Sequence, residues 1–550
     1  MLVSAPPLPP IEVPNANLAE HVLGECRRRA GPDHVVFVDS DSGESLTVGQ
    51  LETLTRRFAR GLRARGIRAG DKVAIFAANS IYYPFVAYGI VAAGAVCAPA
   101  NPLYTPRDLA HQLSDMSCRA IVVGDGLQDT VMEAQRLIGR TLDHVWAMDE
   151  SKSMCEESVF HVADAAADDG DGDDCDDDEV PVDHMVAAAY VCYSSGTTGK
   201  PKGVVLTHCN MIANMMQINS IKTLDVLTAN QRGYEIYLGL APFCHTYGLS
   251  FVLHSSVALG GQIVVMRRYS FDALLTTVEE HHITYAYVVP PIVCALSKDP
   301  RVASRNLSSM HTLLSGGAAL SPTLIRTTEE RLPGLRVVQG YGMTEMSPVV
   351  TMLSTRHNNP ASIGVLIPGC QAKVVDDQGA ELGPNTAGEL CFRGPNVMPG
   401  YLGNAAATRE IIHDDGFLHT GDIGYIDDAG FFYVTDRKKE LIKFKGFQVA
   451  PAELEALLAE HPYIEDAAVM AVYDENQATE LPRGYLVLKP SDEDDRVLGQ
   501  QVVDWLDARV APFKRLRGGF EIVDHIPRSP AGKIIRSALR NKVMPAAAAV

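Results

Sequence analysis

The sequence lacks several features that would place it in common protein classes. Its 11 cysteines are scattered, odd in number and without a Cys-x-x-Cys pair, which argues against a disulfide or zinc framework and indicates reduced thiols. The formal net charge of -19 disfavours a general nucleic-acid binder. The longest apolar stretch, residues 85–100, is interrupted by glycine and proline and is too short for a transmembrane segment.

Targeting signals are also missing. Residues 1–14 are rich in proline and carry no basic segment of the kind that opens a secretion signal. The last residues, 546–550, do not form a Ser-Lys-Leu peroxisomal signal. We therefore expect a cytoplasmic protein.

A chain of 550 residues with 46% hydrophobic residues is long enough for several domains with large cores. Helical apolar spacing over 51–65, strand patterns at 71–77 and 119–124, and a helix opened by Thr105-Pro106 predict parallel sheets covered by helices. Residues 361–434 are dominated by short strands and turns. The acidic run at 168–179 predicts a flexible surface loop, 165–183, and lacks the ligand spacing of a calcium site.

The segment 193–203, Tyr-Ser-Ser-Gly-Thr-Thr-Gly-Lys-Pro-Lys-Gly, is the main functional signal. It follows a predicted buried strand, and we expect a helix after it. Its glycines let backbone N–H groups approach a ligand, and its hydroxyls and lysines add donors and positive charge, which favours phosphate binding. It is not a Walker loop, because Pro201 stands where that pattern requires glycine. The segment 340–345 is not a dinucleotide fingerprint, because it ends in Glu345.

This segment strongly resembles the phosphate-loop signature of the acyl-adenylate-forming superfamily, which includes acyl-CoA synthetases, peptide-synthetase adenylation domains and beetle luciferases. The resemblance extends over about residues 30–540. Its further signatures stand in order at 238–248, 313–319, 337–345, 419–422, 435–453 and 526–536. The segment Gly-Glu-Leu-Cys-Phe-Arg-Gly at 388–394 is similar to the box of 4-coumarate-CoA ligases and their near relatives.

The resemblance implies an α/β fold. A large N-terminal adenylation domain, 1–435, would combine two helix-covered, parallel-type sheets with a β-rich subdomain. A hinge at 436–439 would join it to a small mobile α/β domain, 440–550, that carries the catalytic lysine.

The resemblance also implies roles for individual residues. Lys533 would be the catalytic lysine, Glu345 would bind magnesium, and His245 would stand at the mouth of the acyl pocket. Further catalytic candidates are Thr344, Lys443 and Gln448. ATP and AMP would be held by Ser194, Ser195, Gly196, Thr197, Thr198, Gly199, Lys202, Gly317, Ala318, Gln339, Gly340, Tyr341, Gly342, Thr344, Asp422, Val434, Arg437 and Lys533. The acyl group would meet His245, Tyr247, Phe251, Leu314, Gly317, Gly342, Pro348 and Val349, and CoA would meet Lys445 and Gly446.

The implied activity is an ATP- and Mg²⁺-dependent carboxylate-CoA ligase, with a carboxylic acid, ATP and CoA as small-molecule partners and no nucleic acid. Plant coumarate ligases commonly have a hydroxyl residue where Phe251 stands and a lysine where Leu314 stands. The more apolar pocket leaves cinnamate, benzoate-type and medium-chain acids in competition with 4-coumarate. An amide synthetase, a carrier-protein-loading enzyme, a luciferase-like oxygenase and a non-catalytic binding protein remain alternatives. The sequence predicts no oligomeric state.

Overall fold

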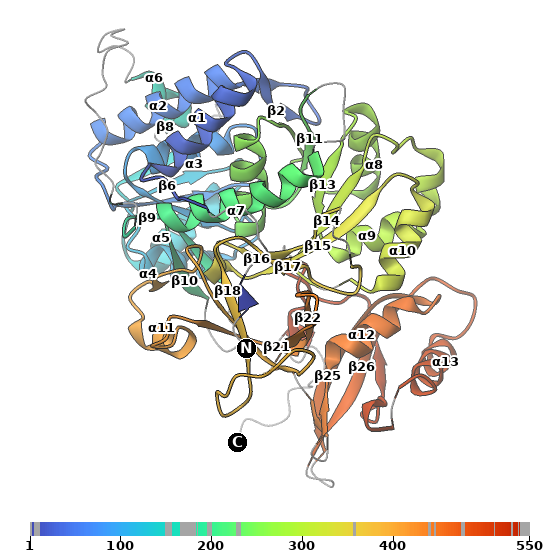
Figure 1. Cartoon of the computed structure of the whole chain (residues 1–550). Coiled ribbons are helices and arrows are strands. Elements are labelled where there is room, and N and C mark those ends of the chain that lie inside the picture. Colours follow the sequence, from blue (N-terminus) through green and yellow to red (C-terminus); the bar gives the residue numbers. More distant parts are fainter. Residues whose placement is uncertain are drawn as a thin grey trace.

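The computed structural model shows two large sheets, a smaller β-rich sheet and a C-terminal part (Figure 1). It describes residues 3–4, 11–148, 157–165, 183, 185–194, 201–226, 233–318, 320–355, 359–437, 440, 442–444, 447–474, 479–510, 512–529, 532–536 and 538–539. The predicted acidic loop, 165–183, therefore lies outside the described residues except at its two ends.

The first large sheet contains eight strands of the described chain, in the order β20-β10-β9-β5-β4-β6-β7-β8. From β9 to β8 all neighbours are parallel, whereas β10 pairs antiparallel with both β9 and β20. The strands are β4 (Lys72–Phe76), β5 (Val96–Ala100), β6 (Ala120–Val123), β7 (His144–Ala147), β8 (Glu157–Ser158), β9 (Ala188–Ser194), β10 (Lys202–Thr207) and β20 (Gly400–Tyr401).

The second large sheet has the order β17-β16-β15-β14-β13-β11-β12-β2-β3. It is parallel from β15 to β2 and antiparallel at both edges. The strands are β2 (Val35–Asp39), β3 (Ser45–Thr47), β11 (Ile236–Gly239), β12 (Gln262–Val265), β13 (Tyr285–Val288), β14 (Thr312–Ser315), β15 (Arg336–Gly342), β16 (Val349–Met352) and β17 (Val365–Leu366). The predicted parallel sheets are thus confirmed, with antiparallel strands added at their edges.

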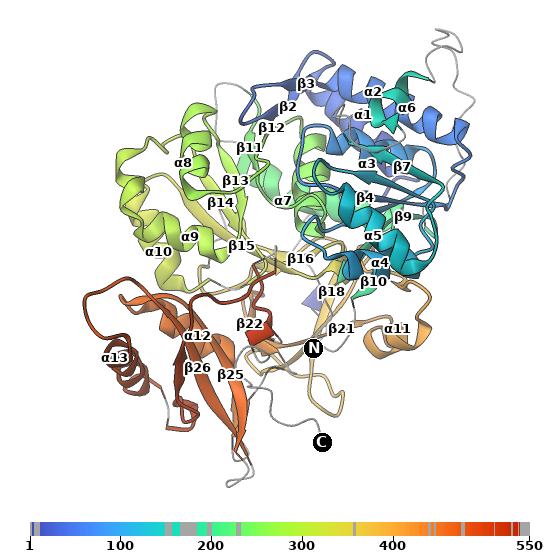
Figure 2. The ribbon, with the colours of Figure 1, turned by 180° about the vertical axis from the view of Figure 1, so that it is seen from behind.

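Helices cover the large sheets and fill the space between them (Figures 1 and 2). Local sequence starts several of them: Thr105 accepts the N–H of Asp108, and the Asp108 carboxylate accepts the N–H of Thr105, which caps α4 as predicted. The helices of this region are α1 (Leu18–Ala30), α2 (Val48–Ala64), α3 (Tyr83–Ala92), α4 (Pro106–Asp115), α5 (Gln128–Ile138), α6 (Val159–Asp164), α7 (His208–Val226), the π-helix η2 (Gly248–Ser256), α8 (Phe271–Glu280), α9 (Pro290–Lys298), η3 (Pro300–Ser304), α10 (Pro322–Arg331) and η4 (Thr344–Met346).

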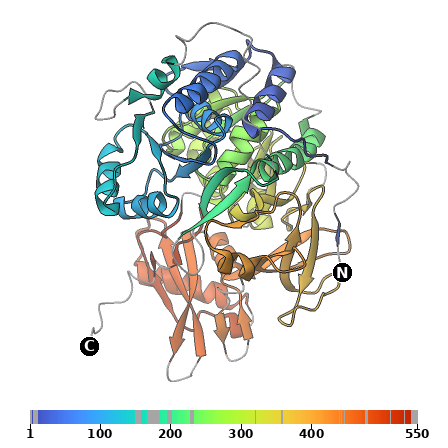
Figure 3. The same cartoon turned by 90° about the vertical axis from the view of Figure 1, so that its left-hand side faces the viewer.

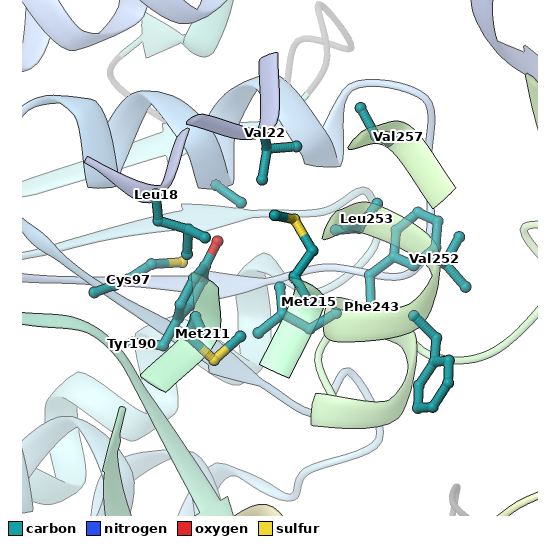
Figure 4. Packing of buried hydrophobic residues seen from close by; sticks show 14 of the residues in the cluster. Leu18, Val22, Cys97, Tyr190, Met211, Met215, Phe243, Val252, Leu253 and Val257 are labelled. Atoms are coloured by element: carbon teal, nitrogen blue, oxygen red, sulfur yellow. The ribbon is translucent and has the colours of Figure 1, made fainter. Parts of the chain in front are cut away.

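One core is shared by the two large sheets, because α7 and η2 pack between them. In Figure 4 Met211 and Met215 of α7 lie beside Leu253 of η2 and Tyr190 of β9. The same cluster of buried residues includes Leu314 of β14 in the second sheet. Because this one buried cluster contains side chains from both large sheets, it fixes the positions of the two sheets relative to each other. Their strand ends therefore form a common edge.

The predicted β-rich region is confirmed as an antiparallel sheet of order β1-β18-β19-β21-β22. Its strands are β1 (Val3–Ser4), β18 (Gln371–Val375), β19 (Gly388–Arg393), β21 (Leu418–Ile426) and β22 (Phe432–Arg437), and α11 (Ala405–Ile411) belongs to the same stretch of chain. The N-terminal strand β1 joins this sheet although it is far away in sequence.

The C-terminal part lies below the large sheets and beside the β-rich sheet (Figure 3). Leu454 and Leu458 of its first helix pack with residues of β25 and β26 in a separate buried cluster. Its elements are β23 (Ile442–Phe444), β24 (Phe447–Val449), α12 (Pro451–Glu460), β25 (Ile464–Asp474), β26 (Thr479–Leu488), α13 (Asp495–Asp507), η5 (Pro512–Lys514) and β27 (Phe520–Ile522). Among the described residues, no helix combines the length and apolar character needed to cross a membrane.

Candidate active site

The phosphate-loop segment connects two antiparallel strands. The structure shows β10 directly after it, so the helix expected there, α7, begins only at His208. Ser194 ends β9 and pairs in register with Lys202 at the start of β10. The Ser194 Oγ is buried and has no hydrogen-bond partner within the described part of the chain. A buried hydroxyl of this kind at the mouth of a polar loop fits a ligand such as phosphate.

A carboxylate, a phenol and an ammonium meet beside this hairpin. Glu345, in the turn η4, is 4% exposed, and its Oε1 accepts a hydrogen bond of 2.8 Å from the Tyr401 hydroxyl. The Lys202 Nζ lies 5.1 Å from the centroid of the Tyr401 ring. Thr344 precedes Glu345 and is also buried.

This donor set fits magnesium bound together with phosphate. The described residues contain no group of three or more His, Cys, Asp or Glu side chains arranged to hold a metal ion. Magnesium is commonly bound through one or two carboxylates, with waters and substrate phosphates completing its shell. Glu345 next to the phosphate hairpin matches that pattern.

The adjoining edge of the second sheet carries the predicted glycine signatures. Gly317 and Ala318 follow β14, whereas Gln339, Gly340 and Gly342 lie inside β15, because β15 continues into an antiparallel pair with β16. A Cβ at Gly342 would stand 1.8 Å from the Pro348 carbonyl oxygen, so only glycine allows this pairing.

The Gln339 side chain supports the loop that follows β14. Its Oε1 accepts from the Leu320 N–H at 2.9 Å, and its Nε2 donates to the Ser362 carbonyl at 3.2 Å. The side chain of Gln339 is thus bound to neighbouring backbone, and it fixes the backbone on which Gly317 and Ala318 stand.

Asp422 is held at the same edge by a neighbouring strand. The Tyr341 hydroxyl donates to Asp422 Oδ2 at 2.6 Å, and Asp422 is 6% exposed. Asp422 lies within β21 and pairs in register with Arg437 of β22, near Val434. A fixed carboxylate acceptor here suits a sugar hydroxyl.

His245 is held in one tautomer by the backbone of Tyr247. The Tyr247 N–H donates to His245 Nδ1 at 3.2 Å, which places the imidazole hydrogen on Nε2. Burial, and then the charge of Lys533, lower the pKa of His245 to about 4. The ring is therefore neutral at physiological pH and presents an N–H donor.

Tyr247 contacts two other residues that were predicted to bind the acyl group. The Tyr247 hydroxyl donates to the Leu314 carbonyl at 2.9 Å, and the Tyr247 ring meets Phe251 edge to face at 5.2 Å. Val349 follows the cis Ser347-Pro348 bond, and its carbonyl accepts from the side-chain amide of Asn214 at 2.8 Å.

Lys533 reaches this site from the C-terminal part. Its loop is stiffened by Arg528, which donates to the Gly532 carbonyl at 2.8 Å and binds Asp466 at 2.7 Å. Gly532 packs against Val289 at the end of β13, since a Cβ on Gly532 would stand 3.1 Å from the Val289 Cβ. Lys533 follows Gly532 directly, so this contact brings the lysine to the end of β13.

Comparisons with known proteins agree with this geometry. Residues 25–402 match the AMP-binding enzyme family, and residues 453–533 match the AMP-binding enzyme C-terminal domain. The 4-coumarate–CoA ligase 3 of Oryza sativa subsp. japonica is 36% identical over 545 residues, covering 98% of this chain and 94% of that protein. The chain belongs to the AMP-binding enzyme family.

Solved structures of similar fold include ATP-bound MatB from Rhodopseudomonas palustris, with a TM-score of 0.83, 26% identity and coverage of 96% of this chain and 99% of that one. The amide bond synthetase McbA from Marinactinospora thermotolerans has a TM-score of 0.79 and 22% identity, with coverage of 96% and 100%. The predicted superfamily, the α/β fold and the activity class of an AMP-forming acid–thiol ligase are therefore confirmed.

Some predicted residues of this AMP-binding enzyme lie outside the described structure. They are Ser195, Gly196, Thr197, Thr198, Gly199, Lys445 and Gly446. Lys443 and Gln448 pair in register between β23 and β24, but their side chains, like that of Arg437, are not described. Their roles stay predictions.

Tyr401 is the residue that sequence reasoning missed. It enters the site because β20 pairs with β10, almost 200 residues earlier in the chain. In the sequence, Tyr401 follows Gly400, and this pair is not part of a motif whose spacing indicates a phosphate or metal site.

Proposed function

We propose that this AMP-binding enzyme activates a carboxylic acid as its acyl-AMP and then transfers the acyl group to coenzyme A. The observation that carries the proposal is the contact of Gly532 with Val289, which brings the Lys533 loop next to Val288, whose carbonyl accepts a hydrogen bond from the Tyr247 hydroxyl. That arrangement suits the first half-reaction, because an ammonium there would face both the carboxylate of the acid and the α-phosphate of ATP.

In the first step a carboxylate oxygen forms a bond to the α-phosphorus of ATP, and the bond to the β-phosphate oxygen breaks to release pyrophosphate. Lys533 would stabilise the negative charge on the α-phosphate, and Ser194, Lys202 and residues 195–199 would hold the leaving phosphates. Glu345, positioned by Tyr401, would hold magnesium, which supplies further charge neutralisation when bound. The ribose would be positioned by Asp422, with Val434 and Arg437. The adenine and the α-phosphate would be positioned by Gly317, Ala318 and residues 339–342, with Thr344.

In the second step the CoA thiol sulfur attacks the acyl carbon, loses its proton and displaces AMP. We propose that residues 440–550 rotate about the hinge at 436–439 relative to residues 1–435, which removes Lys533 from the site. Lys443 and Gln448 would then face the acyl-AMP, with Lys445 and Gly446 beside CoA.

The acid is proposed to be hydrophobic: an aryl-propenoic, benzoic or medium-chain fatty acid. His245, Tyr247, Phe251, Leu314, Gly317, Gly342, Pro348 and Val349 would surround its acyl group. Phe251 and Leu314 are apolar and buried, which supports a site without a partner for a phenol hydroxyl.

An acceptor other than CoA is the second candidate. It is favoured by the similarity of fold to the amide bond synthetase McbA. An amine would attack the same acyl carbon, so every residue assigned to the first step would be retained.

The test measures AMP release with ATP, magnesium and CoA for cinnamate, 4-coumarate, benzoate, hexanoate and palmitate, together with ATP–pyrophosphate exchange. We expect a CoA thioester from at least one hydrophobic acid. Exchange without thioester would move the assignment to a different acceptor, and the absence of exchange with every acid would overturn the proposed function.

A further inference from the structure

A fully buried lysine next to the candidate acyl site has no part in the chemistry above. Lys222, near the end of α7, is 0% exposed. Its ammonium donates to the Tyr287 hydroxyl at 2.6 Å, to Ser255 Oγ at 3.2 Å and to Ser256 Oγ at 3.5 Å. Its Nζ also lies 4.4 to 5.4 Å from the centroids of three tyrosine rings, that of Tyr287 among them.

Burying an ammonium is costly unless its N–H groups are bound, and an apolar side chain of similar length would fill the same space without that cost. The contacts of Lys222 therefore indicate a task other than filling volume. Its shortest bond is to Tyr287.

The hydrogen positions around Tyr287 follow from its neighbours. The Ser256 hydroxyl donates to the Phe251 carbonyl at 2.9 Å, so its own hydrogen is used. At the 2.9 Å contact between Ser256 and Tyr287, the phenol must therefore be the donor. The Tyr287 oxygen thus accepts from Lys222 and donates to Ser256, and a change of the Tyr287 χ1 angle, which would move this oxygen, would break both bonds.

Tyr287 stands next to the residues assigned to the acyl group. It pairs in register with Leu314 on the neighbouring parallel strand, so both side chains are on the same face of the sheet. Its ring centroid is 5.4 Å from that of Phe251 and 6.2 Å from that of Tyr247. The ring of Tyr287 therefore lies between Phe251 and Tyr247 on one side and Lys222 of α7 on the other.

We propose that Lys222 is a positioning residue that holds Tyr287 as the end wall of the acyl site, so that the enzyme selects short acids with an apolar far end. The inference rests on the proposed function, because the acyl site is assigned there. Because the Tyr287 hydroxyl is bound to Lys222 and Ser256, a substrate meets the ring of Tyr287 with its far end. A distal hydroxyl gains no bond there, and a long chain meets the ring before it is fully accommodated.

The experiment compares ATP–pyrophosphate exchange for cinnamate, 4-coumarate, hexanoate and decanoate. The variants are Lys222→Met, Tyr287→Phe, their combination, and Tyr287→Ala. Tyr190→Phe is the matched control, since it also removes one buried phenol, which lies 3.2 Å from His254 Nε2 and outside the acyl set. KM for ATP and the melting temperature are measured for each protein.

We expect the wild type to prefer cinnamate to 4-coumarate and hexanoate to decanoate. Tyr287→Ala should raise the decanoate-to-hexanoate ratio of kcat/KM about tenfold, in the range that a pocket changed by a few methylenes gives. Lys222→Met and Tyr287→Phe should each shift the ratio a few-fold in the same direction. The double variant should add little to either, because both changes remove one interaction. KM for ATP should not change.

Unchanged acid ratios in Lys222→Met and Tyr287→Ala, with a lower melting temperature alone, would overturn the inference and leave Lys222 as a packing residue. The same holds if Tyr190→Phe shifts the ratios equally. Wild-type exchange with no acid at all would overturn the proposed function instead, so the two failures are distinguishable. If Lys222→Met does not fold, Tyr287→Phe and Tyr287→Ala still decide the outcome.

Discussion

The two regions that meet at the candidate active site are built differently. In the N-terminal region the loop at 344–349 is tied by buried amides: the Asn396 side chain donates to the Met346 carbonyl at 2.9 Å and to the Val349 carbonyl at 3.0 Å. Two contacts that the described residues make across to the C-terminal part are an exposed one, from Lys298 Nζ to the Ala459 carbonyl at 3.0 Å, and a small one, of Gly532 against Val289.

This difference between the two regions suggests that the N-terminal region binds the substrates and that the C-terminal part controls the chemical step. Buried, fully bonded loops give a binding site that is formed before substrate arrives, whereas exposed contacts of this kind resemble those between domains that move. The preformed region would determine which acid and nucleotide bind, and the C-terminal part would determine when the charge of Lys533 is present.

Removing the positive charge of Lys533 should give the largest effect on acyl-AMP formation. Lys533→Ala should lower acyl-AMP formation by at least about 100- to 1000-fold, the usual cost of losing one preorganised charge or donor in a transition state. Thioester formation from synthetic acyl-AMP should be nearly unchanged, because the lysine would have left the site by then. Pyrophosphate exchange and thioester formation are measured separately. Equal loss in both would contradict the division between the two regions.

A change within the preformed region should affect the metal step. Tyr401→Phe removes the hydroxyl that binds Glu345 Oε1 and should lower adenylation about 10- to 100-fold, as is typical when a partner of a metal ligand is lost. Added magnesium should restore part of the activity, and KM for the acid should stay constant. A titration of exchange against magnesium checks this.

Tyr425→Phe is a suitable control for Tyr401→Phe. Tyr425 stacks on Tyr433 at 4.6 Å in the β-rich sheet, outside the predicted site. A magnesium dependence identical to wild type in Tyr401→Phe would show that the phenol does not position Glu345.

A structural feature of this chain can be predicted from the sequence when the residues that determine it are close together in the sequence. Thr105 and Asp108 cap α4 through residues three apart, and the strand at 285–288 ends before the proline pair 290–291, so both were predictable. The antiparallel pairing of β10 with β20, and of β15 with β16, depends on partners that a local pattern does not specify. A local pattern therefore neither places Tyr401 at the site nor places Gly342 inside a strand. The apolar run before the proline pair is sufficient to place Tyr287 in a strand, but its partner Lys222 lies 65 positions away.

The contact between the two regions can be tested at Gly532. This residue has φ of +78°, and a Cβ would stand 3.1 Å from the Val289 Cβ. Gly532→Ala should lower adenylation about tenfold, because backbone strain of roughly 1–3 kcal/mol and crowding both oppose the seated loop. Gly519→Ala is the matched control: its φ is +75°, but a Cβ there meets nothing within 4 Å. Adenylation rates are compared at equal folded fraction. Equal losses in the two variants would show that strain alone, and not the contact with Val289, is responsible.

The smallest effect is expected at the exposed contact between α9 and α12. Lys298 donates from the N-terminal region to the carbonyl of Ala459 in the last turn of α12, where a positive charge is favourable. Lys298→Met should therefore weaken the arrangement in which the Lys533 loop lies against Val289, and it should lower the adenylation rate about twofold. The rate of thioester formation from acyl-AMP should rise or stay level. Lys514→Met is the control, because it removes an ion pair of 2.6 Å, with Glu453, that lies within the C-terminal part. The ratio of the two half-reaction rates is the measurement. A parallel change of both rates in Lys298→Met would indicate that this contact stabilises the fold without shifting the balance between the two arrangements.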